Sequence, residues 1–299
     1  MQRRVFTLFG VCLLAGFSFA IGYLCPEVIG RRLTLNRTGQ LFTTTATVPS
    51  KLDRFPALKS YVTSLRRIPA GFFHMGSNSV YSANPEHKVM VSEFRMGATP
   101  VSVAVWKEYC AATGMSLPKA PSWGWLDDHP IVGVSWNDIC GSDGKSGFCG
   151  WASEVVGQRL TLPTEAQFEY ASRGGLDGDG YPWGNTHFDR SKLWCSNKKF
   201  GDAGKTAPVN RLTNISTNWY GLSDMTGNVP QWCSDLYGPY SSRDQTDPTG
   251  PSSTQENERC FRGCSWMFYE PGVFLCAYRW STKADTKGLI GFRLTAGPE

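Results

Sequence analysis

The segment over residues 220–229 reads Tyr-Gly-Leu-Ser-Asp-Met-Thr-Gly-Asn-Val, with apolar residues set between Gly, Asp and Asn. Because Gly, Asn and Asp favour tight turns, this segment predicts a turn and not a long helix or strand. The same alternation of short apolar runs and turn residues continues from Ile68 to the end of the chain. It predicts short strands joined by long loops, in one domain over residues 68–299.

Two helices are expected inside this domain. A stripe of apolar side chains at helical spacing predicts the first over residues 102–113, and Gly114 ends it. Thr164 and Gln167 form the capping box of the second, which ends at Gly174. Neither helix carries a pair of side chains that is typical of catalysis.

The composition indicates a loop-rich globule. Of the 299 residues only 18% are charged, whereas 13% are aromatic and eleven are Trp, so rings are expected to fill the core. The net charge of +5 is uneven, because residues 1–67 hold ten Lys or Arg and two acids. The rest is slightly acidic, which argues against binding nucleic acid. Residues 25–67 are basic and Thr-rich and are expected to form a spacer, with a short helix over residues 56–67.

The amino terminus predicts export. Arg3 and Arg4 precede an uncharged run over residues 5–24, which has about the length that crosses a bilayer. Small residues precede a cleavage point after Ala20, so residues 1–24 are either a cleaved signal peptide or an N-terminal membrane anchor. In both cases the N-terminal end engages a membrane and the remaining chain is periplasmic or otherwise extracytoplasmic.

Cysteine usage agrees with export. Outside the leader region the count is even, which suits disulfides in an oxidising compartment. The sequence does not choose among the pairings, but Cys140 and Cys149 flank a Gly- and Ser-rich turn and are the best local pair. The eight are Cys110, Cys140, Cys149, Cys195, Cys233, Cys260, Cys264 and Cys276.

Several segments, in order, resemble the formylglycine-generating enzyme family, also called the sulfatase-modifying-factor family. They include Leu-Pro-Thr-Glu-Ala at 162–166, Arg-Gly-Cys-Ser-Trp at 262–266 and Gly-Phe-Arg-Leu at 291–294. Further matching segments are 71–77, 130–136, 159–170, 181–184 and 220–229. The resemblance implies an α+β fold, an elaborated C-type-lectin-like domain that is rich in loops, with short strands and few helices.

Catalytic members of this family, as the resemblance implies, use two thiolates to bind Cu(I) and activate O2, which oxidises a cysteine in a peptide. The corresponding positions here are Phe268 and Val273. No catalytic residue is therefore assigned, copper is not expected, and enzymatic activity stays open. Two alternatives remain for Cys260, Cys264 and Cys276. Either they supply a relocated pair of copper-binding thiols, or they are ordinary disulfides and buried thiols.

Two cysteines resemble halves of family disulfides. Cys276 and Cys149 match positions that belong to two different bridges in relatives. The partner positions hold Ser172 and Leu294, so the resemblance does not carry those pairings over to this chain.

The resemblance also implies structural calcium, which family members hold in two loops with oxygen ligands. In the second loop Gln231 replaces a carboxylate, which should weaken the site. The alternative for both loops is a turn rich in Asn, Asp and Gly without metal. The matching residues are Asn197, Lys198, Asp202 and Gly204 for the first site, and Asp224, Gly227 and Val229 for the second.

The C-terminal segment over residues 265–280 lies where family members bind an extended peptide. Its aromatic and Arg side chains are typical anchors of interfaces, although half of the rings could instead fill the core. The expected ligand-binding residues are Trp266, Phe268, Tyr269, Tyr278, Arg279 and Trp280.

Three functions remain open from the sequence. The first is a non-oxidase accessory domain that binds a protein or peptide and is stabilised by calcium. The second is a periplasmic maturation oxidoreductase that acts on a peptide or siderophore precursor. The third is a purely structural envelope protein.

Overall fold

The computed structural model describes residues 50–178, 180–184, 187–196, 204–209, 211 and 217–298, and the backbone of 31–35 and 41–45. The chain divides into two units, residues 1–49 and 50–299. In the first unit, β1 (Arg31–Leu35) and β2 (Leu41–Thr45) pair antiparallel. In the described part of the chain, no helix is long and apolar enough to span a membrane. The expected leader, residues 1–24, lies outside the described residues.

The second unit begins before residue 68, where the sequence analysis placed the start of the domain. It opens with η2 (Lys51–Arg54), α1 (Pro56–Thr63) and β3 (Arg66–Ile68). The carboxylate of Glu108 accepts hydrogen bonds from the free N–H groups of Ala57 and Leu58 at the start of α1. Leu58 is fully buried. These contacts make α1 part of the domain core and not part of a spacer.

Three sheets form from the described strands of the second unit. One has the order β3-β6-β12-β7, so that the first and last strands of the unit share a sheet. The second has the order β4-β5-β9, and the third has the order β11-β10-β8. The bounds are β4 (Gly71–Met75), β5 (His87–Val91), β6 (Phe94–Met96), β7 (Leu160–Thr161), β8 (Gln231–Leu236), β9 (Gln245–Thr246), β10 (Glu258–Arg262), β11 (Arg279–Lys283) and β12 (Thr295–Ala296).

Both predicted helices are present. They are α2 (Val103–Thr113) and α5 (Glu165–Arg173), and each ends at a glycine with positive φ. The capping box at Thr164 forms as expected. Two further helices, α3 (Trp136–Cys140) and α4 (Gly147–Val156), flank the turn between Cys140 and Cys149. Single-turn helices are η3 (Tyr81–Ala83), η4 (Arg190–Lys192) and η5 (Pro271–Phe274).

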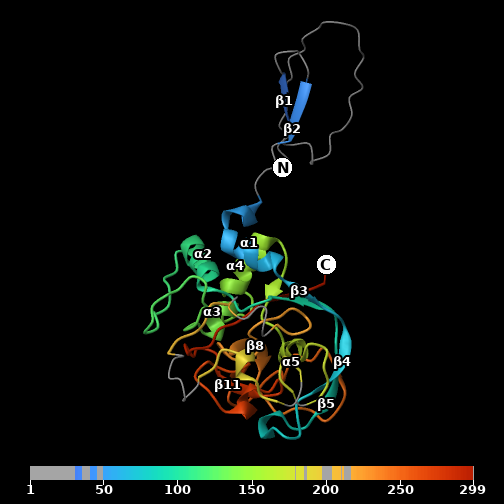
Figure 1. Ribbon diagram of the computed structural model, residues 1–299. Coiled ribbons are helices and arrows are strands. Elements are labelled where there is room, and N and C mark those ends of the chain that lie inside the picture. Colours follow the sequence, from blue (N-terminus) through green and yellow to red (C-terminus); the bar gives the residue numbers. More distant parts are fainter. Residues whose placement is uncertain are drawn as a thin grey trace, which may run out of the picture. The chain divides into compact units, whose positions relative to one another are not determined.

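Aromatic rings fill the core, as the composition predicts. Trp106 stacks on Phe148 with centroids 5.2 Å apart, and Phe292 meets Phe148 edge-on at the same distance. Helix α5 contacts β4 and β5 as well as β8 and β10, and Figure 1 shows it between these strands. The architecture is a mixed α+β domain with short strands and few helices. Through its contacts with β10, α5 supports the start of the loop that holds the candidate site.

Candidate functional site

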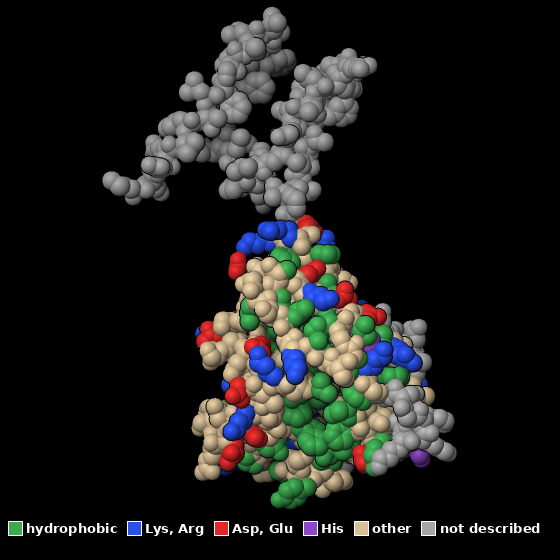
Figure 2. Space-filling view, turned by 90° about the vertical axis from the view of Figure 1, so that its left-hand side faces the viewer, with side chains coloured by type: hydrophobic (Ala, Val, Ile, Leu, Met, Phe, Trp, Pro, Cys, Tyr) green, Lys and Arg blue, Asp and Glu red, His purple; other side chains and the backbone are tan. Residues whose placement is uncertain are grey.

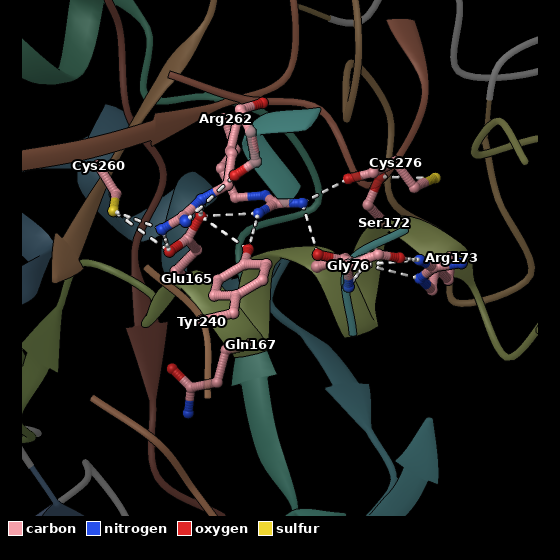
Figure 3. Close-up of polar contacts among 12 residues, drawn as sticks. Gly76, Glu165, Gln167, Ser172, Arg173, Tyr240, Cys260, Arg262 and Cys276 are labelled. Carbon is pink, nitrogen blue, oxygen red and sulfur yellow. Dashed lines mark hydrogen bonds and ion pairs between the residues drawn. The ribbon is translucent and has the colours of Figure 1, made fainter. Parts of the chain in front are cut away.

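The loop after β10 is held at both ends by one buried side chain. Arg262, the last residue of β10, donates from Nη1 to Glu165 at 2.8 Å and from Nη2 to Glu169 at 2.6 Å. The same Nη2 donates to the carbonyl of Cys276 at 2.6 Å, fourteen residues further along the chain (Figure 3). Arg262 is fully buried. Helix α5 therefore fixes both ends of the loop over residues 262–276, which overlaps the segment where the family resemblance implies peptide binding.

Arg279 belongs to this interior network. Its Nε and Nη2 donate to the two carboxylate oxygens of Glu165 at 2.7 and 2.5 Å, which is a bidentate ion pair. Burial on its own raises the pKa of Glu165, but Arg279 and Arg262 outweigh burial and hold this pKa at about 2. Because the guanidinium of Arg279 is committed to Glu165, it is not free to anchor a ligand at the surface.

The two positions that hold thiols in catalytic relatives lie in one apolar cluster. Phe268 and Val273 are both partly buried and pack against the cluster that contains Cys264 and Phe274, and so does Cys195. Neither Phe nor Val carries an atom that binds a metal. Burial raises the pKa of Cys264 to about 12, so without a metal it is a protonated thiol at neutral pH. Among the described residues, no three His, Cys, Asp or Glu side chains could hold a metal ion together.

An apolar cavity of about 200 Å³ opens beside Phe268. The ring of Phe268 lies 5.8 Å from that of Trp280, which in turn stacks on Phe261 at 6.3 Å. We call this space the Phe268 cavity; its lining residues are Pro230, Phe261, Gly263, Cys264, Ser265, Met267, Phe268, Trp280, Leu289 and Ile290.

Apolar side chains of the folded unit are also exposed, one of them at the edge of the Phe268 cavity. Met267 at its edge is 48% exposed. Figure 2 shows hydrophobic side chains gathered in a patch on the lower half of one face of the folded unit. A contiguous exposed apolar patch is typical of an interaction surface.

The other expected ligand-binding residues have different places. Tyr278 packs on Trp280 with ring centroids 5.1 Å apart, whereas Trp266 meets Trp123 edge-on at 5.9 Å. The backbone carbonyl of Tyr269 accepts a hydrogen bond from Arg190. Phe268 and Trp280 thus line the cavity, and Tyr278 contacts the ring of Trp280 without lining the cavity itself.

The second expected calcium loop forms a tight turn. Asp224, Gly227 and Asn228 all have positive φ, between 55° and 77°. Burial raises the pKa of Asp224 to about 6, while Asn228 and Arg293 act in the opposite direction. The Nδ2 group of Asn228 donates to the Asp224 carboxylate at 3.0 Å. Of the first expected loop, Gly204 is exposed, and Asn197, Lys198 and Asp202 lie outside the described residues.

The eight cysteines of the body are all described, and each is a free thiol in the structure. Cys140 and Cys149, the expected local pair, are both buried and are not joined by a disulfide. Cys276 faces Ser172, whose hydroxyl donates to the sulfur at 3.3 Å. This is the residue that stands at the partner position of the family disulfide, so a hydrogen bond occupies the place of that bridge.

Comparison with known proteins agrees with this geometry. A family model described as the sulfatase-modifying factor enzyme 1-like domain matches residues 53–297. The chain belongs to this family. A formylglycine-generating enzyme of Thermomonospora curvata is 29% identical over 314 residues, which cover 97% of this chain and 94% of that enzyme. The family and the α+β fold class inferred from the sequence are thereby confirmed.

Two further comparisons are informative. The inactive C-alpha-formylglycine-generating enzyme 2 of Bos taurus is 32% identical over 211 residues, covering 66% of this chain and 58% of that protein. The structure of PvdO from Pseudomonas aeruginosa matches with a TM-score of 0.66 at 22% identity, over 78% of this chain and 94% of that one. At this identity the structural likeness shows the fold alone.

Proposed function

We propose that this chain is an exported, non-oxidase recognition domain that binds an extended segment of a partner protein. The observation that carries the proposal is the environment of Phe268. This residue stands where catalytic relatives have their first copper thiol, and its ring forms a wall of an open apolar cavity. A phenyl ring cannot bind copper as a thiol does, and it provides apolar contact area instead.

The size of the Phe268 cavity suits one side chain. An apolar cavity of about 150 Å³ is large enough to bind benzene. A volume of about 200 Å³ therefore admits a single aromatic or branched aliphatic side chain. The lining is apolar on nearly all sides, so a charged side chain would lose its hydration there without compensation.

Strand β11 supplies the rest of the proposed binding surface. It lies at the edge of its sheet, with β10 on one side, and its Trp280 lines the Phe268 cavity. An edge strand presents unpaired N–H and C=O groups, with which an extended peptide can pair. A peptide bound in this way would direct alternate side chains toward the cavity.

Two expectations from the sequence are retained as parts of the proposal. Export rests on the charge and hydropathy pattern of residues 1–24. Calcium binding by the first loop rests on the resemblance of Asn197, Lys198, Asp202 and Gly204 to family ligands.

A display library of random peptides, selected on the full-length protein, tests the function. We expect enriched peptides to share one large apolar residue. The variant Leu289→Trp fills the cavity and should weaken their binding at least tenfold. Leu176→Trp is the matched control, because Leu176 is a partly exposed leucine that does not line the cavity. No enrichment, or equal binding to Leu289→Trp and the wild type, would contradict the proposal.

A further inference from the structure

The orientation of the Gln231 side chain is fixed by its neighbour Arg293. Both residues are fully buried. The Nε group of Arg293 donates to Oε1 of Gln231 at 2.7 Å. A guanidinium only donates hydrogen bonds, so the oxygen of the amide must face Arg293. The NH2 group of Gln231 is therefore directed to the opposite side, toward the turn over residues 224–229.

This NH2 group contacts carbonyl oxygens of the residues that match calcium ligands in relatives. Nε2 of Gln231 donates to the carbonyl of Asp224 at 2.7 Å and lies 3.5 Å from the carbonyl of Val229. Arg293 donates a second hydrogen bond to the Asp224 carbonyl at 3.1 Å. A carbonyl oxygen has two lone pairs, and both are used here.

These contacts do not fit a calcium ion. Calcium takes six to eight oxygen ligands at about 2.3–2.6 Å. The two lone pairs of the Asp224 carbonyl are taken by the NH2 group of Gln231 and the guanidinium of Arg293, so this oxygen has none left for an ion. An amide NH2 group carries partial positive charge, so it repels a cation. One oxygen of the Asp224 carboxylate accepts a hydrogen bond from Asn228.

We infer that Gln231 and Arg293 close the turn over residues 224–229 in place of a metal ion, so that this chain has replaced the second calcium site of its family by an internal hydrogen-bond network. This differs from the weakened site that the sequence alone suggests. The sequence shows that a carboxylate has become an amide, but it does not show which atom of the amide faces the carbonyls.

The replacement has a consequence for the loop beside the Phe268 cavity. The backbone N–H of Trp266 donates to the carbonyl of Asn228 at 3.0 Å. A Cβ atom at Gly263 would lie 2.8 Å from the carbonyl of Met225, so the loop rests directly on the turn. Because the turn is closed without metal, its support of this loop is independent of calcium.

Restoring the carboxylate tests the inference. Full-length wild type and variants are stripped with chelator, equilibrated by dialysis against millimolar calcium, and analysed for bound calcium per chain. We expect Gln231→Glu to bind one more calcium ion than the wild type and to show a larger rise in Tm with calcium. The control Gln167→Glu adds the same charge to a capping box and should bind as many ions as the wild type.

A second variant keeps the inference falsifiable if Gln231→Glu fails to fold. Gln231→Met removes the amide without adding a ligand. It should lower the Tm by the same amount with and without calcium, and leave the number of bound ions unchanged. The inference is overturned if Gln231→Met binds one ion fewer than the wild type, or if folded Gln231→Glu binds no more than the wild type.

Discussion

Truncating Phe268 separates a role in binding from a role in the core, and Phe274 provides the matched control. Phe274 is fully buried in the same cluster. Phe274→Ala should therefore cost about 3–5 kcal/mol of the free energy of unfolding. Phe268 is only partly buried, and one side of its ring already faces an open cavity. Phe268→Ala should accordingly cost about 1–2 kcal/mol of that free energy.

The backbone at residue 268 should stay in place in this variant. Its N–H donates to the carbonyl of Ser265 and its carbonyl accepts from the N–H of Ser196, and neither bond involves the ring. A loss of peptide affinity then reports the missing side chain. For an interface anchor we expect a loss of about 2 kcal/mol, which is about thirtyfold in Kd.

Two measurements on each variant test this reasoning. Urea unfolding gives the free energy of unfolding, and fluorescence anisotropy with a selected peptide gives Kd. We expect Phe268→Ala to lose affinity with a small loss of stability, and Phe274→Ala to lose mainly stability. If Phe268→Ala destabilises the domain as much as Phe274→Ala and leaves the affinity unchanged, Phe268 is a core residue and the binding-face hypothesis is refuted.

Three further predictions concern stability and redox state. Arg262→Ala leaves two buried carboxylates short of a partner and should lower the free energy of unfolding, measured in urea, by about 3–5 kcal/mol. Arg67→Ala, which breaks an ion pair at the surface, should leave it almost unchanged. Burial and the charge of Glu165 raise the pKa of Asp235 to about 7, above its unfolded value. The native state therefore binds this proton more tightly than the unfolded state does, so the free energy of unfolding should fall as pH rises from about 4 to 7. Asp235→Asn should flatten this dependence on pH, and an unchanged dependence would contradict a raised pKa at Asp235. With oxidised glutathione as the oxidant, Cys140 and Cys149 should lose two hydrogens and form a disulfide, which peptide mass spectrometry without reductant detects; two alkylated thiols would contradict this.

Local signals in the sequence were sufficient for part of the fold. The stripe of apolar residues in α2 and the capping box of α5 depend on neighbours within one or two turns, so both helices could be predicted. The sequence predicts a spacer at helix α1, because the residues around it are basic and no nearby residue indicates that the helix contacts the core. That connection is made by Glu108, which lies about 50 residues away in sequence.

The candidate site shows the same limit. The aromatic segment over residues 265–280 was recognised, but Arg279 within it pairs with Glu165, which is 114 residues away. The sequence gives only a weak signal for this network. Arg262 stands between the apolar Phe261 and the small Gly263, and a charged side chain that is buried there needs a partner of opposite charge. The sequence predicts a weakened metal site at Gln231, because it gives the residue type and not the direction of the amide.

The central claim is that this member of the family binds a peptide without oxidising it. The most direct measurement incubates the full-length protein with Cu(I), O2 and a selected peptide that also contains a cysteine in a sulfatase-type sequence. Retention of the peptide is followed by anisotropy, and its chemistry by mass spectrometry. The account predicts a bound peptide of unchanged mass. Loss of the cysteine thiol with gain of the formylglycine aldehyde would contradict it.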